Sequence, residues 1–240
     1  GKTDEVIKIP GTATKLLVFT GLGENKSTFA DETLRRAAGA AARALAGNSS
    51  ATFSLPAKKA ATIAAIAEGA LLGAYSFNKF RVDSILNRQA SLKSVTIHSA
   101  LAKKAEAKEA IKSAAIIGEY TCLVRDLINT PPSHLTPDSF CKEITALVKK
   151  VGGSTIGLKV TVTNDAQLKS KGFGGITAVG QGSANPPRLL QISYTPVKAK
   201  AKKSYAYVGK GITFDTGGLA LKPAAGMEAM KSDMSGAAAV

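Results

Sequence analysis

The 240-residue chain is poor in several residue types on which common functional classes depend. It has no tryptophan, and aromatic residues make up 5% of it. Two histidines occur: His98 lies in a strand-like run and His134 in a proline-rich turn, which gives a Ser-His-Asp triad little support. The two cysteines, Cys122 and Cys141, lack metal-type spacing. They favour reduced thiols, and therefore a cytoplasmic protein.

Long apolar runs are missing as well. The longest ones are interrupted well before the ~18 residues that a membrane-spanning helix needs. No signal-peptide pattern opens the chain. With 45% hydrophobic residues and 23 glycines, the composition is ordinary for an alanine-rich α/β protein. The sequence therefore predicts a cytoplasmic protein without a membrane partner.

Acidic residues are few relative to basic ones. The chain has 17 Asp and Glu against 32 Lys and Arg, a net charge of +15, which raises the hypothesis of nucleic-acid binding. The lysines are scattered, however, and are not interleaved with aromatic residues. We interpret the lysine-rich run Val197–Ser204 as a solvated loop before a strand. DNA binding stays as an alternative, which would weaken steeply with added salt.

Strand-like and helix-like segments alternate in the first half of the chain. Such alternation predicts an α/β domain with a largely parallel sheet. The expected strands are Lys15–Thr20, Ser50–Leu55 and Val95–Ser99; the expected helices are Asp31–Ala46 with Asp31 as N-cap, Pro56–Tyr75 and Lys103–Ile128.

A proline-rich turn, Asn129–Pro137, ends the long helix and predicts a domain boundary. We assign residues 1–128 to an N-terminal α/β domain with an interdomain helix, and residues 129–240 to a second α/β domain with a mixed sheet flanked by helices. Its expected elements are helix Pro137–Lys150, strand Lys159–Thr163, a short helix capped by Asn164 or Asp165, strands Ile176–Val179, Leu189–Tyr194 and Tyr205–Val208, and a helix from Ser235.

The stretch from Tyr207 to Gly236 carries the most chemistry. The buried strand expected at its start would deliver Lys210 into a glycine-rich turn, and Asp215, Lys222 and Asp233 follow. Charges crowded among small residues indicate a site that a ligand approaches closely. Competing motifs fail on spacing, because the chain has neither a Walker loop nor the third glycine of a dinucleotide fingerprint near Gly172.

This stretch resembles the signature of the leucine aminopeptidase family, also called cytosol aminopeptidases. The family pattern is Val-Gly-Lys-Gly-x-Thr-Phe-Asp-Ser/Thr-Gly-Gly, then Lys, then Asp-Met-x-Gly-Ala-Ala. Val208–Gly218, Lys222 and Asp233–Ala238 match it. Glu68–Phe80, with aromatic residues that we interpret as packing residues, and the loop Gly180–Arg188 are family-like too.

The resemblance implies a two-metal exopeptidase that releases N-terminal residues, preferably leucine, from peptides. Asp215 matches the carboxylate that bridges two manganese or zinc ions, while Asp233 and Lys210 match ligands of one of them. Lys222 matches the catalytic lysine that stabilises the oxyanion. Met230 matches the pocket for the N-terminal side chain, where a flexible thioether suits leucine. Taken singly, the lysines would be surface residues, Asp215 a turn residue and Met230 core packing; their joint spacing favours the functional interpretation.

One part of the family pattern is absent. The segment Asn-Thr-Asp-Ala-Glu-Gly-Arg, which supplies further metal ligands and a catalytic arginine, does not occur. The chain resembles a family member truncated within its catalytic domain and starting partway into its first domain. We therefore expect it to hold at most one ion well and to be inactive alone. The resemblance also implies a homo-hexamer. A noncatalytic scaffold of the same fold is the other alternative.

Overall fold

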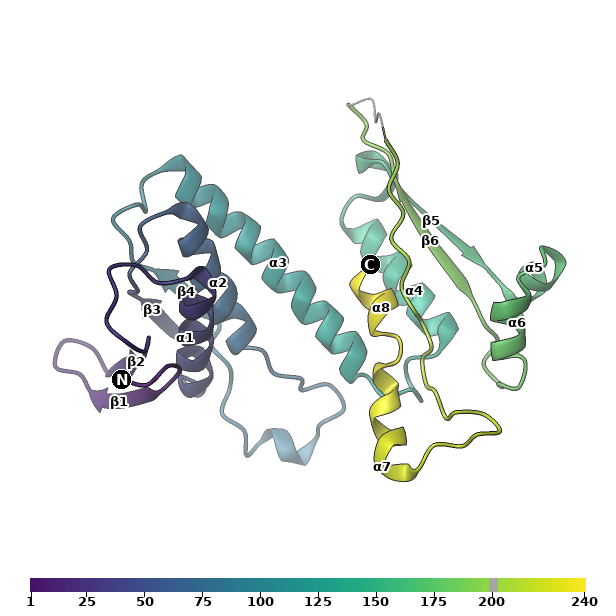
Figure 1. Ribbon diagram of the computed structural model, residues 1–240, viewed down its shortest axis with the longest axis horizontal. Helices are drawn as coiled ribbons and strands as arrows, with labels where there is room; N and C mark the ends of the chain where they lie inside the picture. The colour runs from purple at the N-terminus through teal and green to yellow at the C-terminus, as the bar shows by residue number, and fades with distance from the viewer. Residues whose placement is uncertain (199–202) are drawn as a thin grey trace. The chain divides into compact units, whose positions relative to one another are not determined.

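The structure is a computed structural model that describes residues 1–198 and 203–240. Part of the loop predicted at Val197–Ser204 therefore lies outside the described residues. The chain divides into two compact units, Gly1–Arg125 and Asp126–Val240. Figure 1 labels the helices and strands of both units.

The first unit contains four short strands and two complete helices. Its elements are β1 (Val6–Pro10), β2 (Leu16–Thr20), α1 (Asp31–Ala44), β3 (Ser50–Phe53), α2 (Ala60–Gly73), a 3-10 turn (Asp83–Ile85), β4 (Ser94–Ile97) and most of α3 (Ala105–Asn129). The α/β class expected from the alternating pattern is confirmed. Strand β1 was not expected.

The largely parallel sheet predicted for this unit is wrong. β1 pairs with β2 antiparallel, and β3 pairs with β4 parallel, in two separate two-stranded sheets. The connection explains each pairing: a short link joins β1 to β2, as in a hairpin, whereas α2 lies between β3 and β4 in the chain, as a parallel crossover requires.

Two helix starts differ from the prediction. Ala30, not Asp31, is the N-cap of α1, and no side chain caps the helix. The Asp31 carboxylate instead accepts a hydrogen bond from Thr62 Oγ1 at 2.7 Å, with Lys59 Nζ 3.1 Å away. Helix α2 begins at Ala60 rather than at Pro56. Asp31 therefore joins α1 to α2 by a tertiary contact that the local pattern did not reveal.

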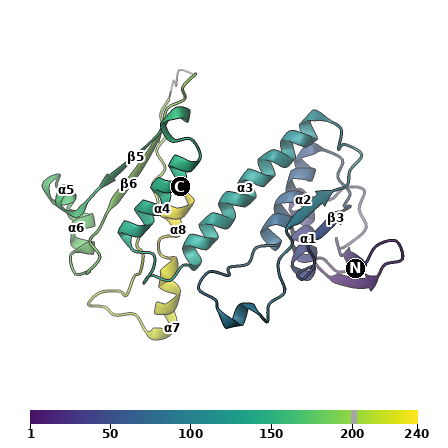
Figure 2. The same cartoon turned by 180° about the vertical axis from the view of Figure 1, so that it is seen from behind.

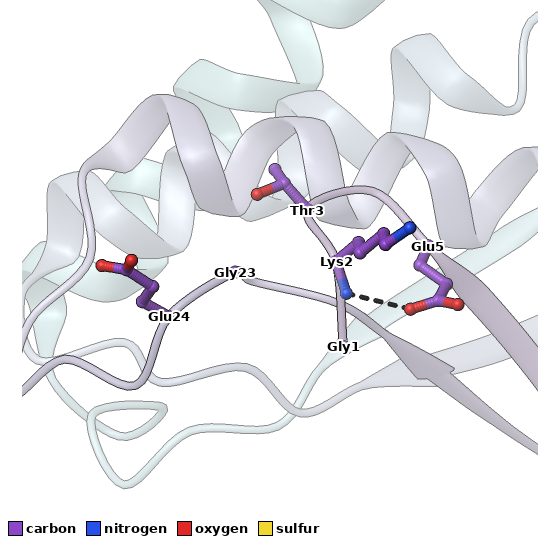
Figure 3. Close-up of a pocket in the computed structure, with 6 residues that line it drawn as sticks. All are labelled: Gly1, Lys2, Thr3, Glu5, Gly23 and Glu24. Carbon is purple, nitrogen blue, oxygen red and sulfur yellow. Dashed lines mark hydrogen bonds between the residues drawn. The ribbon is translucent and has the colours of Figure 1, made fainter.

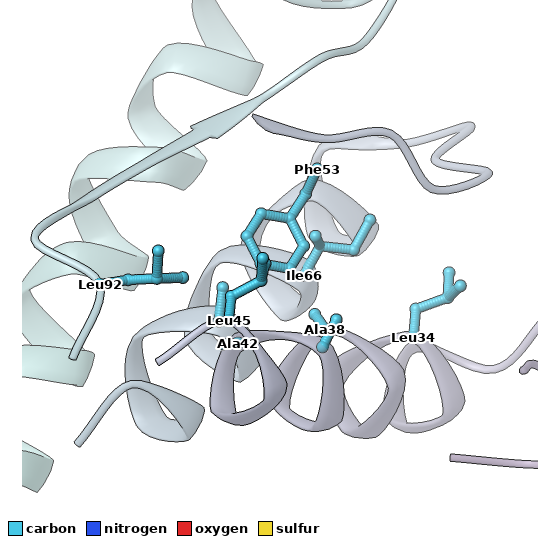
Figure 4. Packing of buried hydrophobic residues seen from close by; sticks show 9 residues of the cluster. Leu34, Ala38, Ala42, Leu45, Phe53, Ile66 and Leu92 are labelled. Atoms are coloured by element: carbon cyan, nitrogen blue, oxygen red, sulfur yellow. The ribbon is translucent and has the colours of Figure 1, made fainter. Parts of the chain in front are cut away.

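The core of this unit lies between α1, α2 and the strands. Figure 4 shows Phe53 of β3 and Ile66 of α2 beside the alanine-rich face of α1, with Leu45 and Leu92 at its edge. Leu34 and Ile66 are fully buried. Because alanine side chains are short, α1 and α2 pack closely along their length.

The second unit is built around helix α4 (Pro137–Lys150). It continues with a 3-10 turn (Gly153–Ile156), β5 (Leu158–Thr163), α5 (Asp165–Ser170), α6 (Gly174–Gly180), β6 (Leu189–Tyr194), α7 (Ala224–Met227), a 3-10 turn (Glu228–Ser232) and α8 (Ser235–Ala239). Figure 2 shows α5 and α6 together at one end of the β5–β6 ribbon. Thr136 and Asn164 cap α4 and α5 with capping boxes, so the predicted cap at Asn164 is confirmed.

Two of the strand predictions for this unit are wrong. Residues 176–179 lie within helix α6, and Tyr205–Val208 forms no strand. Tyr205, Tyr207 and Val208 are exposed, by 77%, 80% and 93%, rather than buried. Within the described residues, the only sheet in this unit is the antiparallel pair β5–β6, in place of the mixed sheet. An extended segment becomes a strand only when a neighbour accepts its backbone hydrogen bonds.

Candidate functional site

The predicted site residues lie on an irregular segment and on the start of a short helix. Lys210, Asp215 and Lys222 belong to the irregular stretch that precedes α7, and Asp233 directly precedes Met234, the N-cap of α8. Met234 is 1% exposed and anchors the start of α8 in this unit. The Ala237 N–H donates a hydrogen bond of 2.8 Å to the Lys210 carbonyl, so the two segments touch through their backbones.

The first ion pair of the site joins Lys210 to Asp233. Lys210 Nζ lies 3.1 Å from Asp233 Oδ2, although 22 residues lie between the two in sequence. Within the described part of the chain, Asp233 Oδ2 is buried and accepts no hydrogen bond of good geometry, so the ammonium is an ionic neighbour only. A buried carboxylate oxygen in this condition has the capacity to bind a further cation.

The second ion pair joins Lys222 to Asp215. Lys222 Nζ is 2.7 Å from Asp215 Oδ2 and also donates to the Asp215 carbonyl at 3.3 Å. The Gly217 N–H donates to Asp215 Oδ1 at 2.8 Å. Gly217 has φ +90°, a backbone conformation that would be strained for a residue with a side chain. The Lys222 N–H donates to the Thr216 carbonyl at 2.9 Å and closes the loop. A tight turn therefore brings the lysine back to its carboxylate.

Charges from both ion pairs affect the pKa of Asp215. The hydrogen bond from Lys222 lowers the pKa of Asp215 most, followed by the Gly217 N–H, and the charges of Lys222 and Lys210 lower it further. Lys210 is thus close enough to act on Asp215 while it pairs with Asp233. Its lowered pKa keeps the Asp215 carboxylate ionised to a lower pH than an ordinary aspartate. The structure brings Lys210, Asp215, Lys222 and Asp233 together in one region.

Met230 lies on the 3-10 turn Glu228–Ser232, half-buried, and its carbonyl accepts the Asp233 N–H at 3.2 Å. The sequence interpretation passed over Lys231 on the same turn. Lys231 Nζ donates to the Asn129 carbonyl at 3.4 Å and so ties the turn before Asp233 to the end of α3. A pattern of residue types does not reveal a contact of this kind, because its acceptor is a backbone atom far away in sequence.

The donor set fits one divalent ion better than two. The described residues contain no group of three or more His, Cys, Asp or Glu side chains that could hold a metal. The site offers two carboxylates, Asp215 and Asp233, and the Lys210 amine, which is ordinarily protonated and cannot donate a lone pair in that state. The Asp233 oxygen without a hydrogen bond is the clearest vacant acceptor among them.

An open depression occurs elsewhere, in the first unit. Figure 3 shows its lining residues, Gly1, Lys2, Thr3, Glu5, Gly23 and Glu24, with the Lys2 N–H donating to Glu5 Oε2 at 2.9 Å. None of the predicted site residues lines it. Among the helices of the described residues, none has the length and apolarity needed to cross a membrane.

Comparisons with known proteins cover most of the chain. Residues 1–84 match the model of the cytosol aminopeptidase family N-terminal domain, and residues 122–240 match the model of its catalytic domain. All predicted site residues lie within the second match.

Curated relatives and solved structures agree with these matches. The chain is 45% identical to a probable cytosol aminopeptidase of Micrococcus luteus, covering 100% of this chain and 47% of the relative. It is 46% identical to a probable cytosol aminopeptidase of Streptomyces avermitilis, covering 100% of this chain and 48% of the relative. It thus spans about half the length of the curated relatives it matches.

The solved structure of the bottromycin maturation enzyme BotP in complex with Mn is 34% identical, with a TM-score of 0.80 over 100% of this chain and 49% of that one. The same enzyme, in a second structure, matches with a TM-score of 0.81 at 33% identity over 99% of this chain and 48% of that one. Two models of this family together match most of the residues, and the two relatives are 45% and 46% identical; the chain belongs to the cytosol aminopeptidase family.

Proposed function

We propose that this chain supplies part of the active site of a metal-dependent aminopeptidase. The observation that carries the proposal is the cluster of two carboxylates and two lysines, Lys210 with Asp233 and Lys222 with Asp215. The similarity to BotP, whose structure contains Mn, supports a divalent ion of that kind. Residues 129–240 would belong to the catalytic domain, and residues 1–128 to the N-terminal domain with its interdomain helix.

A divalent ion bound here would activate a water molecule and polarise the peptide carbonyl. The chain's own residues would hold and neutralise it. Asp233 would bind through Oδ2, which accepts no hydrogen bond among the described residues, and Asp215 would face it as the second carboxylate. The Lys210 amine would have to lose its proton before it could bind, which the positive charge of an ion favours.

Lys222 has a different role in this proposal. Its ammonium is held by the Asp215 carboxylate and carbonyl, and its side chain is 30% exposed. A cation fixed in place before the reaction stabilises negative charge as it develops on the carbonyl oxygen. Lys222 is thus proposed as the catalytic lysine, and Met230, half-buried before Asp233, as part of the pocket for a leucine side chain.

A complete two-metal site would need further carboxylates. Two carboxylates and one amine are too few to hold two ions about 3.5–4 Å apart. We therefore propose that the 240-residue chain binds one ion and turns over peptides poorly by itself. For the whole protein we propose a complete two-metal site with a preference for leucine. We also propose that the whole protein is cytoplasmic and forms a homo-hexamer.

Isothermal titration with manganese tests the proposal directly. The unchanged chain is expected to bind one ion, and Asp233→Asn to lose that binding, because it removes the charge of the Oδ2 acceptor. Asp83→Asn, at an exposed aspartate of the first unit, is the matched control and should bind as the unchanged chain does. Two tight sites in the unchanged chain would contradict the one-ion proposal; no binding at all would favour a noncatalytic scaffold.

Hydrolysis of a chromogenic leucine amide adds the functional measurement. With manganese, the chain is expected to show little or no turnover. A longer version of the protein should show turnover that a chelator abolishes. If the longer version also lacked activity, the aminopeptidase proposal would fail.

A further inference from the structure

We infer that two glycines, Gly209 and Gly236, are positioning residues for the metal site, because their backbone contact sets where Lys210 lies relative to Asp233. This inference rests on the proposed function of the site. Neither glycine offers a side chain to a ligand. Both act through the path of the backbone that carries the ligating residues.

The contact between the two segments leaves no room for a side chain. A Cβ atom on Gly209 would lie 2.2 Å from the Gly236 carbonyl oxygen and 2.6 Å from the Ala237 nitrogen. A Cβ atom on Gly236 would lie 2.9 Å from the Lys210 nitrogen. All these neighbours are backbone atoms, which cannot rotate away as the tip of a side chain can. The two segments must separate if either glycine is replaced.

The separation would act on Lys210 at two points. Its carbonyl accepts the Ala237 N–H at 2.8 Å, and its ammonium lies 3.1 Å from Asp233 Oδ2. Ala237 is in the first turn of α8, where backbone N–H groups lack acceptors within the helix. The Lys210 carbonyl supplies one such acceptor. One residue is therefore attached to the start of α8 by its backbone and to Asp233 by its side chain.

The rest of the second unit holds α8 in place. Met234, the N-cap of α8, is buried, and Lys231 is bonded to the Asn129 carbonyl at 3.4 Å. When a side chain is added at position 209, the exposed segment that carries Lys210 moves more easily than α8 does. Lys210 would move away from Asp233, while the buried core of the unit is unaffected.

A graded series of substitutions tests the inference. Gly209→Ala introduces the severe contact and Gly236→Ala the milder one. The matched control is Gly226→Ala, because Gly226 lies on α7 and a Cβ atom there would meet nothing within 4 Å. Loss of an orienting group around a metal ligand weakens metal affinity about 10–100-fold. We expect a loss of this size for Gly209→Ala, a smaller loss for Gly236→Ala and none for Gly226→Ala.

Two readouts separate positioning from a general loss of stability. The visible absorption spectrum of bound cobalt(II) reports the ligand geometry, and we expect it to change in Gly209→Ala and Gly236→Ala but not in Gly226→Ala. Hydrogen exchange of the Ala237 amide should accelerate in the first two variants, while the melting temperature of Gly236→Ala stays close to that of the unchanged chain. If Gly209→Ala does not fold, Gly236→Ala decides the question alone.

The outcomes distinguish this inference from the proposal on which it rests. Manganese binding by the unchanged chain and its loss in Asp233→Asn, together with unchanged affinity and cobalt spectrum in both glycine variants, would overturn the inference alone. An unchanged chain that binds no manganese would overturn the proposed function, and this inference with it.

Discussion

At the scale of single residues, the site is organised by lysines that neutralise carboxylates. Asp215 and Asp233 each have a lysine within about 3 Å, and a backbone N–H adds to the field at Asp215. The pKa of the Asp215 carboxyl is therefore lower than that of an ordinary aspartate. Such a carboxylate is already in the ionic form that binds a cation.

Replacing Lys222 by Met tests the cause of this effect. The hydrogen bond from Lys222 is the largest cause of the lowered pKa of Asp215, so that pKa should rise toward its ordinary value in Lys222→Met. A lowered pKa in the folded state stabilises the fold above the ordinary pKa of about 3.9, and this stabilisation is lost as the pH falls through the folded value. In Lys222→Met, protonation of Asp215 should accordingly contribute less to the fall in the free energy of unfolding at acid pH.

The measurement is an NMR titration of the Asp215 side-chain carboxyl carbon, together with urea unfolding as a function of pH. Lys171→Met is the control, because it removes an exposed lysine of the same unit that does not contribute to the shift. An Asp215 pKa that is the same in Lys222→Met and in the unchanged chain would show that the ion pair is not formed in solution.

At the scale of elements, the helices with local start signals were predicted best. Helix α4 begins after Thr136 and ends at Lys150, as the sequence indicated. Its start is decided by neighbours in the chain: Thr136 Oγ1 accepts the Ser139 N–H at 3.3 Å, and Ser139 Oγ accepts the Thr136 N–H at 2.8 Å. Asp31 is not the N-cap of α1, and its carboxylate accepts a hydrogen bond from the hydroxyl of Thr62, which is distant in sequence.

The cap of α4 is open to a direct test. Thr136→Ala removes the acceptor for the Ser139 N–H and should destabilise the second unit by about 1 kcal/mol. Thr145→Ala makes the same chemical change inside the same helix, where the hydroxyl donates to the Cys141 carbonyl at 2.7 Å. Because alanine has the higher helix propensity, Thr145→Ala should be neutral or slightly stabilising. Urea unfolding followed by circular dichroism compares them, and equal effects would exclude a special role for the cap.

At the scale of the whole molecule, the positive charge is divided almost equally between the two units. Residues 1–125 contain 18 basic and 10 acidic residues, and residues 126–240 contain 14 and 7. The excess of basic over acidic residues is therefore similar in the two units. The sequence contains no nucleic-acid-binding motif beside this charge. Charge that is not gathered at one site attracts polyanions weakly and at long range. Salt screens this long-range attraction.

Retention on a DNA column tests this view. We expect the chain to bind weakly at low ionic strength and to elute by about 0.15 M salt, where the Debye length is about 8 Å. The first unit and the second unit carry similar charge, so neither should account for the retention alone. Retention that persisted well above this salt concentration would point to an organised nucleic-acid surface.

The sequence by itself determined the family signature, the alternation of helices and strands, and the helix starts that depend on residues within one turn. Tertiary structure decided what depends on distant neighbours. Ile176–Val179 became part of a helix, and Tyr205–Val208 stayed exposed and without regular secondary structure, since a strand needs a partner for its backbone. The pairing of Lys210 with Asp233 likewise exists because Gly209 and Gly236 let two backbone segments touch, and only the folded chain brings those segments together.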